Sequence, residues 1–226
     1  MKLLRYGKTK DVYELADGNI LLRFKDTVTG NAATGESDPG GNDVVGTKQG
    51  VASAAVKMTS YYFDILNSLK IPTHFVKSDL VNNDLIVKPA KFFGKGLEFV
   101  VRYKAEGGFV RRFGDFIAKG DKLDSVYEVT LKDDARGDPP ITCGIAVALG
   151  LMTVQEWDGC EKLVKDTCLI VKKDLEKKGL DLIDIKVEVG IVDNKIAIID
   201  EISGGNMRVS KDGRQLDYVE LAGLLK

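Results

Sequence analysis

The chain has few of the residues that build metal clusters, disulfide frameworks and nucleophile–histidine pairs. Its 226 residues include one histidine and three cysteines, and the cysteines lack Cys-x-x-Cys spacing. A single histidine excludes a multi-histidine metal site, and we interpret Cys143, Cys160 and Cys168 as reduced core thiols of a cytoplasmic protein. His74 has no nucleophile near it in the sequence, which favours a strand residue over a catalytic base.

The sequence also lacks an excess of one charge and a long hydrophobic run. Its net charge of −1 argues against a nucleic-acid or anionic-membrane partner, because either requires a basic excess. No apolar run approaches the roughly 18 residues that span a bilayer, and Met1 leads into a strand-like segment rather than a signal peptide. The length of 226 residues is sufficient for one large domain or two lobes.

Hydrophobic patterning predicts an α+β protein with largely antiparallel sheets. Residues 51–69 and 153–179 carry the apolar stripes of two long helices, and Thr153 and Glu156 have the spacing of a capping box. Shorter segments predict strands at 3–6, 11–15, 20–24, 74–77, 84–88 and 97–103, and helices at 109–113 and from about 216.

The same hydrophobic patterning predicts where the chain has a long loop and where it divides into two lobes. The polar, glycine-rich residues 27–46 predict a long loop that is either a functional lid or disordered. The pattern restarts near residues 88–96, so we expect a β-rich lobe at 1–90 and an α/β lobe at 91–226.

The segment DIKVEVG alternates charged and apolar residues, which places Asp184, Lys186 and Glu188 on one strand face. The returning strand is apolar and ends at Asp200. A three-residue loop at 193–195 would set Glu188 opposite Asp200, whereas a two-residue loop would send them to opposite faces. Facing carboxylates repel unless a cation such as magnesium lies between them. Taken alone, the hairpin also fits a solvated strand face.

Two further segments carry cations. In GKTKDVYE, Gly7 lies at a turn with Lys8 and Lys10 beside it, which suits a polyphosphate but also fits an exposed hairpin. Arg102 lies on an apolar strand, a costly place for a guanidinium unless a carboxylate or phosphate meets it. A Gly107–Gly108 break precedes Arg111 and Arg112 at a predicted helix start, where backbone amides could bind an anion; a surface pair fits equally. Arg208, in SGGNMR, fits a solvated loop.

Five segments in order resemble the SAICAR synthetase family, the phosphoribosylaminoimidazole-succinocarboxamide synthases. GKTKDVYE is similar to the family's Gly-Lys-Ala-Lys-x-x-Tyr start, and LKIPTHFV to its Gly-Ile-Pro-Thr strand. EFVVRYKAEGGFVRRFG resembles its Val-Val-Arg segment ending in Arg-Arg-x-Gly. DIKVEVG, and DEIS with Arg208, resemble its Asp-Phe-Lys-x-Glu-Phe-Gly and Asp-Glu-x-Ser-Pro-Asp-x-x-Arg pair.

The resemblance implies a two-lobed fold with ATP at the lobe junction, and a homodimer. It implies an ATP- and Mg2+-dependent ligase that joins the carboxylate of a phosphoribosyl aminoimidazole (CAIR) to L-aspartate in purine biosynthesis. The residues implied to cover the nucleotide are Gly7, Lys8, Thr9, Lys10, Val12 and Lys88. The residues implied to hold magnesium are Glu188 and Asp200, with Lys186 beside the reacting phosphate and Arg102 and Arg208 on the substrate's phosphate or carboxylate.

The sequence departs from the family where the acceptor would bind. The proline and aspartate of Ser-Pro-Asp-x-x-Arg are replaced by Gly204 and Gly205, and Gly108 stands where a serine is expected. The early polar segment is also longer. These departures leave two alternatives: a diverged relative with the same acyl-phosphate chemistry on another carboxylate or amine, and a non-catalytic nucleotide-binding protein.

Overall fold

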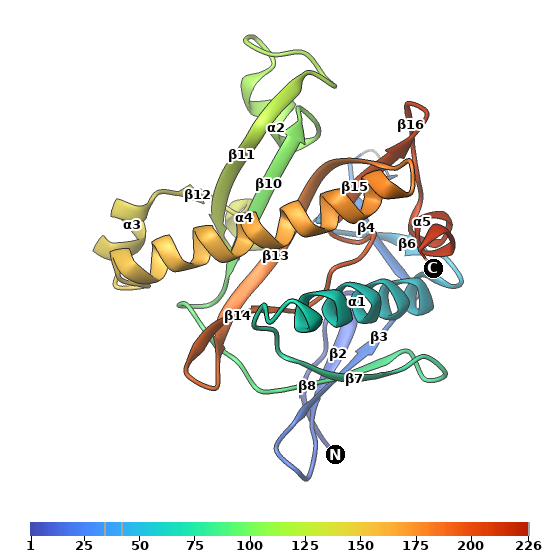
Figure 1. Ribbon diagram of the computed structural model, residues 1–226, viewed down its shortest axis with the longest axis vertical. Coiled ribbons are helices and arrows are strands. Elements are labelled where there is room, and N and C mark those ends of the chain that lie inside the picture. The colour runs from blue at the N-terminus through green and yellow to red at the C-terminus, as the bar shows by residue number, and fades with distance from the viewer. Residues whose placement is uncertain (34, 42, 226) are drawn as a thin grey trace.

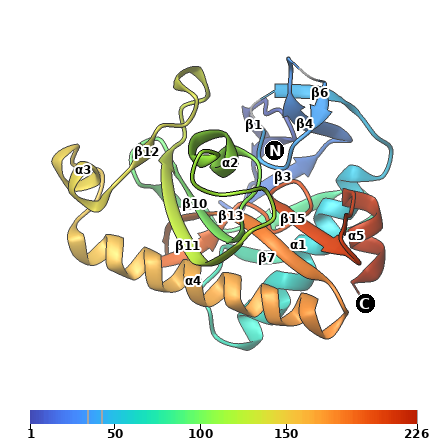
Figure 2. The ribbon, with the colours of Figure 1, turned by 90° about the horizontal axis from the view of Figure 1, so that it is seen from above.

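The computed structural model describes residues 1–33, 35–41 and 43–225 and has the predicted α+β architecture, with three antiparallel sheets (Figures 1 and 2). Thr34, Asn42 and Lys226 lie outside the described residues. The strands are β1 Lys2–Arg5, β2 Lys10–Glu14, β3 Ile20–Phe24, β4 Thr27–Asn31, β5 Glu36–Ser37, β6 Asp43–Thr47, β7 Phe75–Asp79, β8 Asp84–Val87, β9 Lys91–Phe92, β10 Leu97–Lys104, β11 Lys122–Leu131, β12 Pro140–Ile141, β13 Asp181–Val192, β14 Lys195–Ile199, β15 Met207–Lys211 and β16 Arg214–Gln215. The helices are α1 Val51–Ser68, α2 Gly108–Phe113, α3 Cys143–Ala148, α4 Val154–Lys177 and α5 Tyr218–Leu224, with a 3-10 turn at Asp134–Arg136.

Strand β13 organises the larger, eight-stranded sheet. Its first half pairs with β10 and β15, and its second half pairs with β14 and β9. The structure confirms the alternation predicted from its sequence: Ile185, Val187 and Val189 all pack into the core on one face of the strand. Helix α4 covers that face and begins with the predicted capping box at Thr153. The charged residues of β13 therefore lie on the opposite, uncovered face.

Helix α1 connects the larger sheet to the five-stranded sheet β1-β2-β3-β8-β7. One of its faces, with Tyr62 and Phe63, packs into the core shared with α4 and β13. Another face, with Ala52 and Val56, packs on β3 and β8. The carboxylate of Asp26 accepts hydrogen bonds from the amides at the start of α1, which fixes the helix to the end of β3. The helix thus holds the two sheets in a fixed relation (Figure 1).

The prediction of a long loop at residues 27–46 was wrong. The described part of this segment forms a small antiparallel sheet, β5-β4-β6. The polar composition concealed it, because none of its strands alternates strongly enough to signal a buried face. Strands β11, β9, β12, β15 and β16 and helix α3 were not predicted.

Cysteine burial is partly as expected. Cys160 and Cys168 are buried free thiols, whereas Cys143 is half-buried at the start of α3. Within the described residues, no helix is long and apolar enough to cross a membrane. The division into lobes at residue 90 stays a prediction: the two large sheets change over between β8 and β9, but α1 contributes to the cores of both.

Candidate active site

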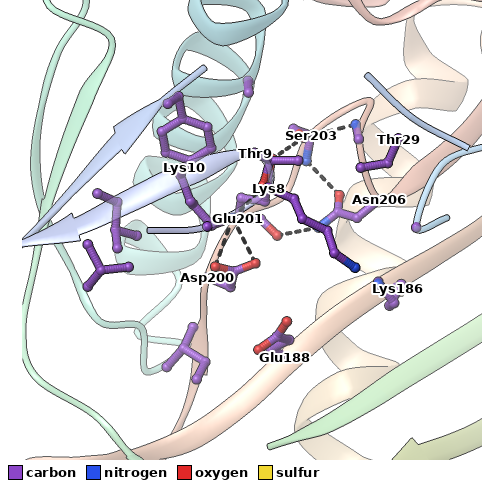
Figure 3. Close-up of a pocket in the computed structure, with 18 of the residues that line it drawn as sticks. Lys8, Thr9, Lys10, Thr29, Lys186, Glu188, Asp200, Glu201, Ser203 and Asn206 are labelled. Carbon is purple, nitrogen blue, oxygen red and sulfur yellow. Dashed lines mark hydrogen bonds and ion pairs between the residues drawn. The ribbon is translucent and has the colours of Figure 1, made fainter. Parts of the chain in front are cut away.

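A cavity of about 450 Å³ lies between the five-stranded sheet and the charged face of the eight-stranded sheet. It collects side chains from the N-terminal turn, the hinge after β8, β13 and the segment after β14 (Figure 3). The predicted residues that line it are Gly7, Lys8, Thr9, Lys10, Val12, Lys88, Lys186, Glu188 and Asp200. Residues that are far apart in sequence therefore meet in one cavity.

Gly7 is required by the turn that leads into β2. A Cβ at this position would lie 2.2 Å from the carbonyl oxygen of Lys10, a distance that no side chain tolerates. The turn is closed by the amide of Gly7, which donates to Asp11 Oδ1 at 3.2 Å, and by Lys25 Nζ, which donates to the Gly7 carbonyl at 2.9 Å. The glycine is thus explained by the chain's own geometry, while Lys8 and Lys10 remain at the cavity.

The apolar part of the cavity lies beside the hinge at residues 88–90. Val12, Leu22 and Val87 line it from the five-stranded sheet, and Ile199 lines it from β14. The Lys88 ammonium points away to the Asp193 carboxylate at 2.6 Å, so its backbone and aliphatic stem are what the cavity offers. The apolar side chains of this wall suit a flat ring such as a purine.

The β13–β14 hairpin closes with the two-residue turn, so of the two loop lengths that the sequence left open the structure has the one that does not pair Glu188 with Asp200. Val192 pairs with Lys195 across Asp193 and Asn194, both of which have the positive φ of a tight hairpin turn. The register pairs Glu188 with Ile199, not with Asp200.

Glu188 and Asp200 nevertheless share the cavity. Asp200 is the first residue past β14 and has a φ of 67°, a left-handed conformation that breaks the strand alternation. Figure 3 shows Asp200 and Glu188 lining the same space, with Lys186 further along β13. The predicted meeting of the two carboxylates is therefore right, but a backbone turn produces it, not the hairpin register.

Lysines balance the charge of this pair of carboxylates, of which Glu188 is buried and Asp200 half-buried. Lys10 Nζ lies 2.9 Å from Asp200 Oδ1 and 2.6 Å from Glu201 Oε1. Lys132, at the end of β11, forms an ion pair with Glu188. Burial disfavours a charged Lys10, but Asp200 and Glu201 outweigh burial and raise its pKa.

The pKa values of Asp200 and Glu188 shift in opposite directions. Burial alone would raise the pKa of Asp200, but Lys10 and Lys132 outweigh it and lower the pKa to about 2. Burial and the nearby Asp200 raise the pKa of Glu188, with Lys132 opposing. The lysines therefore stabilise the ionised form of Asp200, whereas burial and Asp200 disfavour the ionised form of Glu188. Burial also lowers the pKa of the neighbouring His74 to about 4, with Asp200 opposing.

The segment after Asp200 forms a closed hydrogen-bonded loop. Ser203 donates its hydroxyl to Glu201, and Asn206 donates its side-chain amide to the Glu201 carbonyl at 2.6 Å while its Oδ1 accepts from the Ser203 amide at 2.8 Å. Glu201, Ser203, Asn206 and Lys132 line the cavity but were not predicted as site residues. Glu201 and Ser203 lie within the DEIS segment and Asn206 lies three residues after it, so the resemblance of that segment could have indicated all three.

A second cavity of about 310 Å³ adjoins the first and contains the predicted arginines. Asp184 Oδ2 accepts from Arg102 Nη1 at 2.8 Å and from Arg208 Nη1 at 2.6 Å. Both guanidiniums are buried, so Arg208 is not the solvated loop residue that its sequence context fits. Arg208 also forms an ion pair with Asp38, from the segment between β5 and β6. Lys186 lines both cavities.

Two glycines near the second cavity have structural explanations, and one of them, Gly204, is a departure from the family. A Cβ on Gly204 would lie 2.7 Å from Cδ1 and 2.9 Å from Cα of Tyr218, so the α5 helix occupies the space that a proline would fill. A Cβ on Gly107 would lie 2.5 Å from Arg208 Nη2, so the glycine lets that guanidinium reach Asp184. The loop after Ser203 thus packs closely against Tyr218, and that packing requires Gly204.

The carboxylates of Glu188 and Asp200 suit a magnesium ion that also binds phosphate. Within the ranges that the structure describes, no three His, Cys, Asp or Glu side chains form a complete metal cage. A Mg2+ ion is usually held by one or two carboxylates together with water and substrate phosphates. Glu188 and Asp200 match that requirement, since they leave the remaining positions to a polyphosphate.

Known proteins are similar to this chain along nearly its whole length. The profile of the family described as SAICAR synthetase matches residues 3–217. A phosphoribosylaminoimidazole-succinocarboxamide synthase from Clostridium tetani is 48% identical over 100% of this chain and 99% of its own length. One from Methanocaldococcus jannaschii is 31% identical over 90% of this chain and 79% of its own. A solved SAICAR synthetase (Type-2) in complex with ADP superposes with a TM-score of 0.83 at 28% identity, covering 96% of this chain and 88% of its own.

Removing the Lys10 cation is expected to destabilise the protein in a pH-dependent manner. In metal-free buffer at pH 7, Lys10→Met should lower the free energy of unfolding by about 1–2 kcal/mol, because the depressed pKa of Asp200 contributes stability that depends on this lysine. Stability from a depressed carboxyl pKa is present above the unfolded value of about 4 and is lost as the pH falls towards about 2. The difference from wild type should therefore shrink between pH 4 and pH 2. Urea unfolding at several pH values measures it, with the exposed Lys2→Met as control; a deficit that is constant with pH would contradict this account.

Adding a methyl group at Gly204 is expected to destabilise the fold. Gly204→Ala should cost about 1–3 kcal/mol, because its Cβ meets the backbone of Tyr218. Gly223→Ala is the matched control: that glycine lies in α5 with nothing within 4 Å of a Cβ, and its replacement should stabilise by about 0.5–1 kcal/mol. Thermal denaturation compares the two, and equal melting temperatures would remove Tyr218 as the reason for the glycine.

Proposed function

The chain belongs to the SAICAR synthetase family, and from that premise we propose that it is the ATP-dependent ligase that joins CAIR to L-aspartate to give SAICAR in purine biosynthesis. The observation that carries this proposal is the single cavity in which the Gly7 turn, Lys10, Glu188 and Asp200 meet. A non-catalytic protein has no physical need to hold two carboxylates against each other.

The cavity supports a definite orientation of ATP. The adenine ring lies on the apolar wall at Val12, Leu22 and Val87, beside the hinge that begins at Lys88. The phosphates then extend past the Gly7 turn towards Glu188. Lys8 and Lys10 compensate the negative charge of the phosphates. The ADP bound by the Type-2 SAICAR synthetase supports a nucleotide site in this fold.

Magnesium is the proposed partner of the phosphates. Glu188 and Asp200 would hold it, and it would supply charge neutralisation for the transferring phosphoryl group. Lys10 is hydrogen-bonded to Asp200, so it fixes the carboxylate in place and keeps it ionised at neutral pH.

The acceptor is assigned to the second cavity. Arg102 and Arg208 offer charged donors to its phosphate or carboxylate, and Asp184 holds both guanidiniums in place. Burial raises the pKa of Asp184, although Arg208 and Arg102 oppose that shift. An incoming anion would compete with Asp38 for Arg208. Gly108 contributes no hydroxyl there, so this chain relies on the arginines more than its family does.

The chemistry requires positioning and charge rather than a protein nucleophile. An acceptor carboxylate oxygen attacks the γ-phosphorus of ATP, the bond to the β-phosphate oxygen breaks, and ADP leaves with an acyl phosphate formed. The aspartate amine then attacks the acyl carbon, forms the amide and expels inorganic phosphate, losing a proton. Lys186 lines both cavities and pairs with Glu98 at 2.7 Å, so its ammonium is held where the two substrates meet. The homodimer and the cytoplasmic location stay predictions.

Turnover tests the proposal directly. The protein is incubated with ATP, Mg2+, CAIR and L-aspartate, and ADP and SAICAR are followed together. Equal amounts of both products are expected. ADP formation that needs another carboxylate or amine would point to a diverged relative, and no phosphoryl transfer with any acceptor would contradict a ligase.

The metal end is tested by one variant. Asp200→Asn should lower kcat on the order of 10²-fold or more at saturating ATP, because the amide cannot supply the negative charge that holds magnesium. Circular dichroism checks the fold, and Asp212→Asn, on the exposed turn between β15 and β16, is the matched control. Retained activity at ordinary Mg2+ concentrations would remove Asp200 from the metal site.

A further inference from the structure

His74, the single histidine, lies where three parts of the site meet. It precedes β7, is 4% exposed, and follows Thr73, which forms an isolated parallel bridge with Ile198 of β14. Its amide donates to the Ile198 carbonyl at 3.1 Å, and its own carbonyl accepts from the Lys88 amide at 2.7 Å. The backbone of one residue thus ties the hinge at the nucleotide wall to the end of β14.

The imidazole makes a third connection, to the backbone of Asp200. Its Nε2 lies 3.1 Å from the Asp200 carbonyl oxygen. A carbonyl can only accept a hydrogen bond, so Nε2 carries the hydrogen. The ring is held in this orientation by Phe63 of α1, which packs edge-on with centroids 5.6 Å apart. The donor is therefore fixed by the core, not by solvent.

The connection matters because Asp200 has an unfavourable backbone conformation. Its φ of 67° is uncommon for a residue with a side chain and requires support from its surroundings. That turn is what brings the Asp200 carboxylate to Glu188, because the hairpin register alone would send it to the other face. The His74 imidazole supplies such support through its hydrogen bond to the Asp200 carbonyl.

We propose that His74 is a positioning residue that holds the left-handed turn at Asp200 through its Nε2–H and so aligns that carboxylate with Glu188 for the metal–phosphate group. His74 acts through Asp200, and its backbone links the same turn to the nucleotide hinge. This inference rests on the proposed function, because it takes Glu188 and Asp200 as the metal end of an ATP site.

Three variants separate the hydrogen bond from the packing. His74→Gln keeps an N–H donor at about the position of Nε2, whereas His74→Met has similar length and fills the space without a donor. His74→Asn keeps a polar amide that is one carbon too short to reach the carbonyl. Each is compared with wild type by circular dichroism and thermal denaturation to confirm that it is folded.

The decisive measurement is ADP binding by calorimetry with and without Mg2+, which needs no turnover. In wild type, Mg2+ should strengthen ADP binding. In His74→Met and His74→Asn, that strengthening should fall on the order of tenfold, the usual consequence of losing one buried hydrogen bond, while metal-free ADP affinity stays unchanged. His74→Gln should keep most of it. The apparent KM for Mg2+ in the ligase assay should rise in the same two variants.

The outcomes distinguish this inference from the proposed function. If wild type shows no effect of Mg2+ on ADP binding, the metal site fails and the inference with it. If wild type shows the effect and His74→Met keeps it, or if His74→Gln loses as much as His74→Met, the positioning role is overturned while the ligase proposal stands.

Discussion

The site depends on keeping two carboxylates close together in a buried cavity. Glu188 and Asp200 would repel strongly in a low-dielectric setting, and the fold tolerates them because Lys10 and Lys132 reach them from two different sheets. The same arrangement prepares the cavity for a polyphosphate with its metal. Helix α1 is the element that makes it possible, since it packs against both sheets and fixes their separation.

The second cavity, which we assign to the acceptor, is built around buried arginines. Its arginines are buried and need carboxylates to remain so; Asp184 serves both, and Asp38 is added by the small sheet that replaces the expected loop. Tyr218 packs on Gly204 and its hydroxyl lies 3.3 Å from Ser37, so the C-terminal helix supports the same sheet. The departures from the family are therefore connected in space: the longer early segment, the glycines after Ser203 and α5 form one contiguous wall.

The hairpin illustrates how far sequence reasoning reached. Alternation in β13 correctly placed Asp184, Lys186 and Glu188 on one face, because a strand alternates regardless of its partners. The sequence left the loop length open, and the structure has the two-residue turn at Asp193 and Asn194. Glu188 and Asp200 still meet because of a positive φ at Asp200, and no pattern in the sequence signals such a turn at an aspartate.

The sequence by itself determined the elements with strong local signals: both long helices, the capping box at Thr153, the strands of the five-stranded sheet, strands β10, β13 and β14 of the larger sheet, and the order of the family's motifs. These depend on periodicity and short-range hydrogen bonding, which the sequence carries directly. Only the tertiary structure decided which charges meet. Lys132 reaches Glu188, Asp38 reaches Arg208, and His74 supports Asp200 across 56, 170 and 126 residues of chain respectively. Such pairings depend on how sheets pack around α1, and a single sequence holds no local record of that packing.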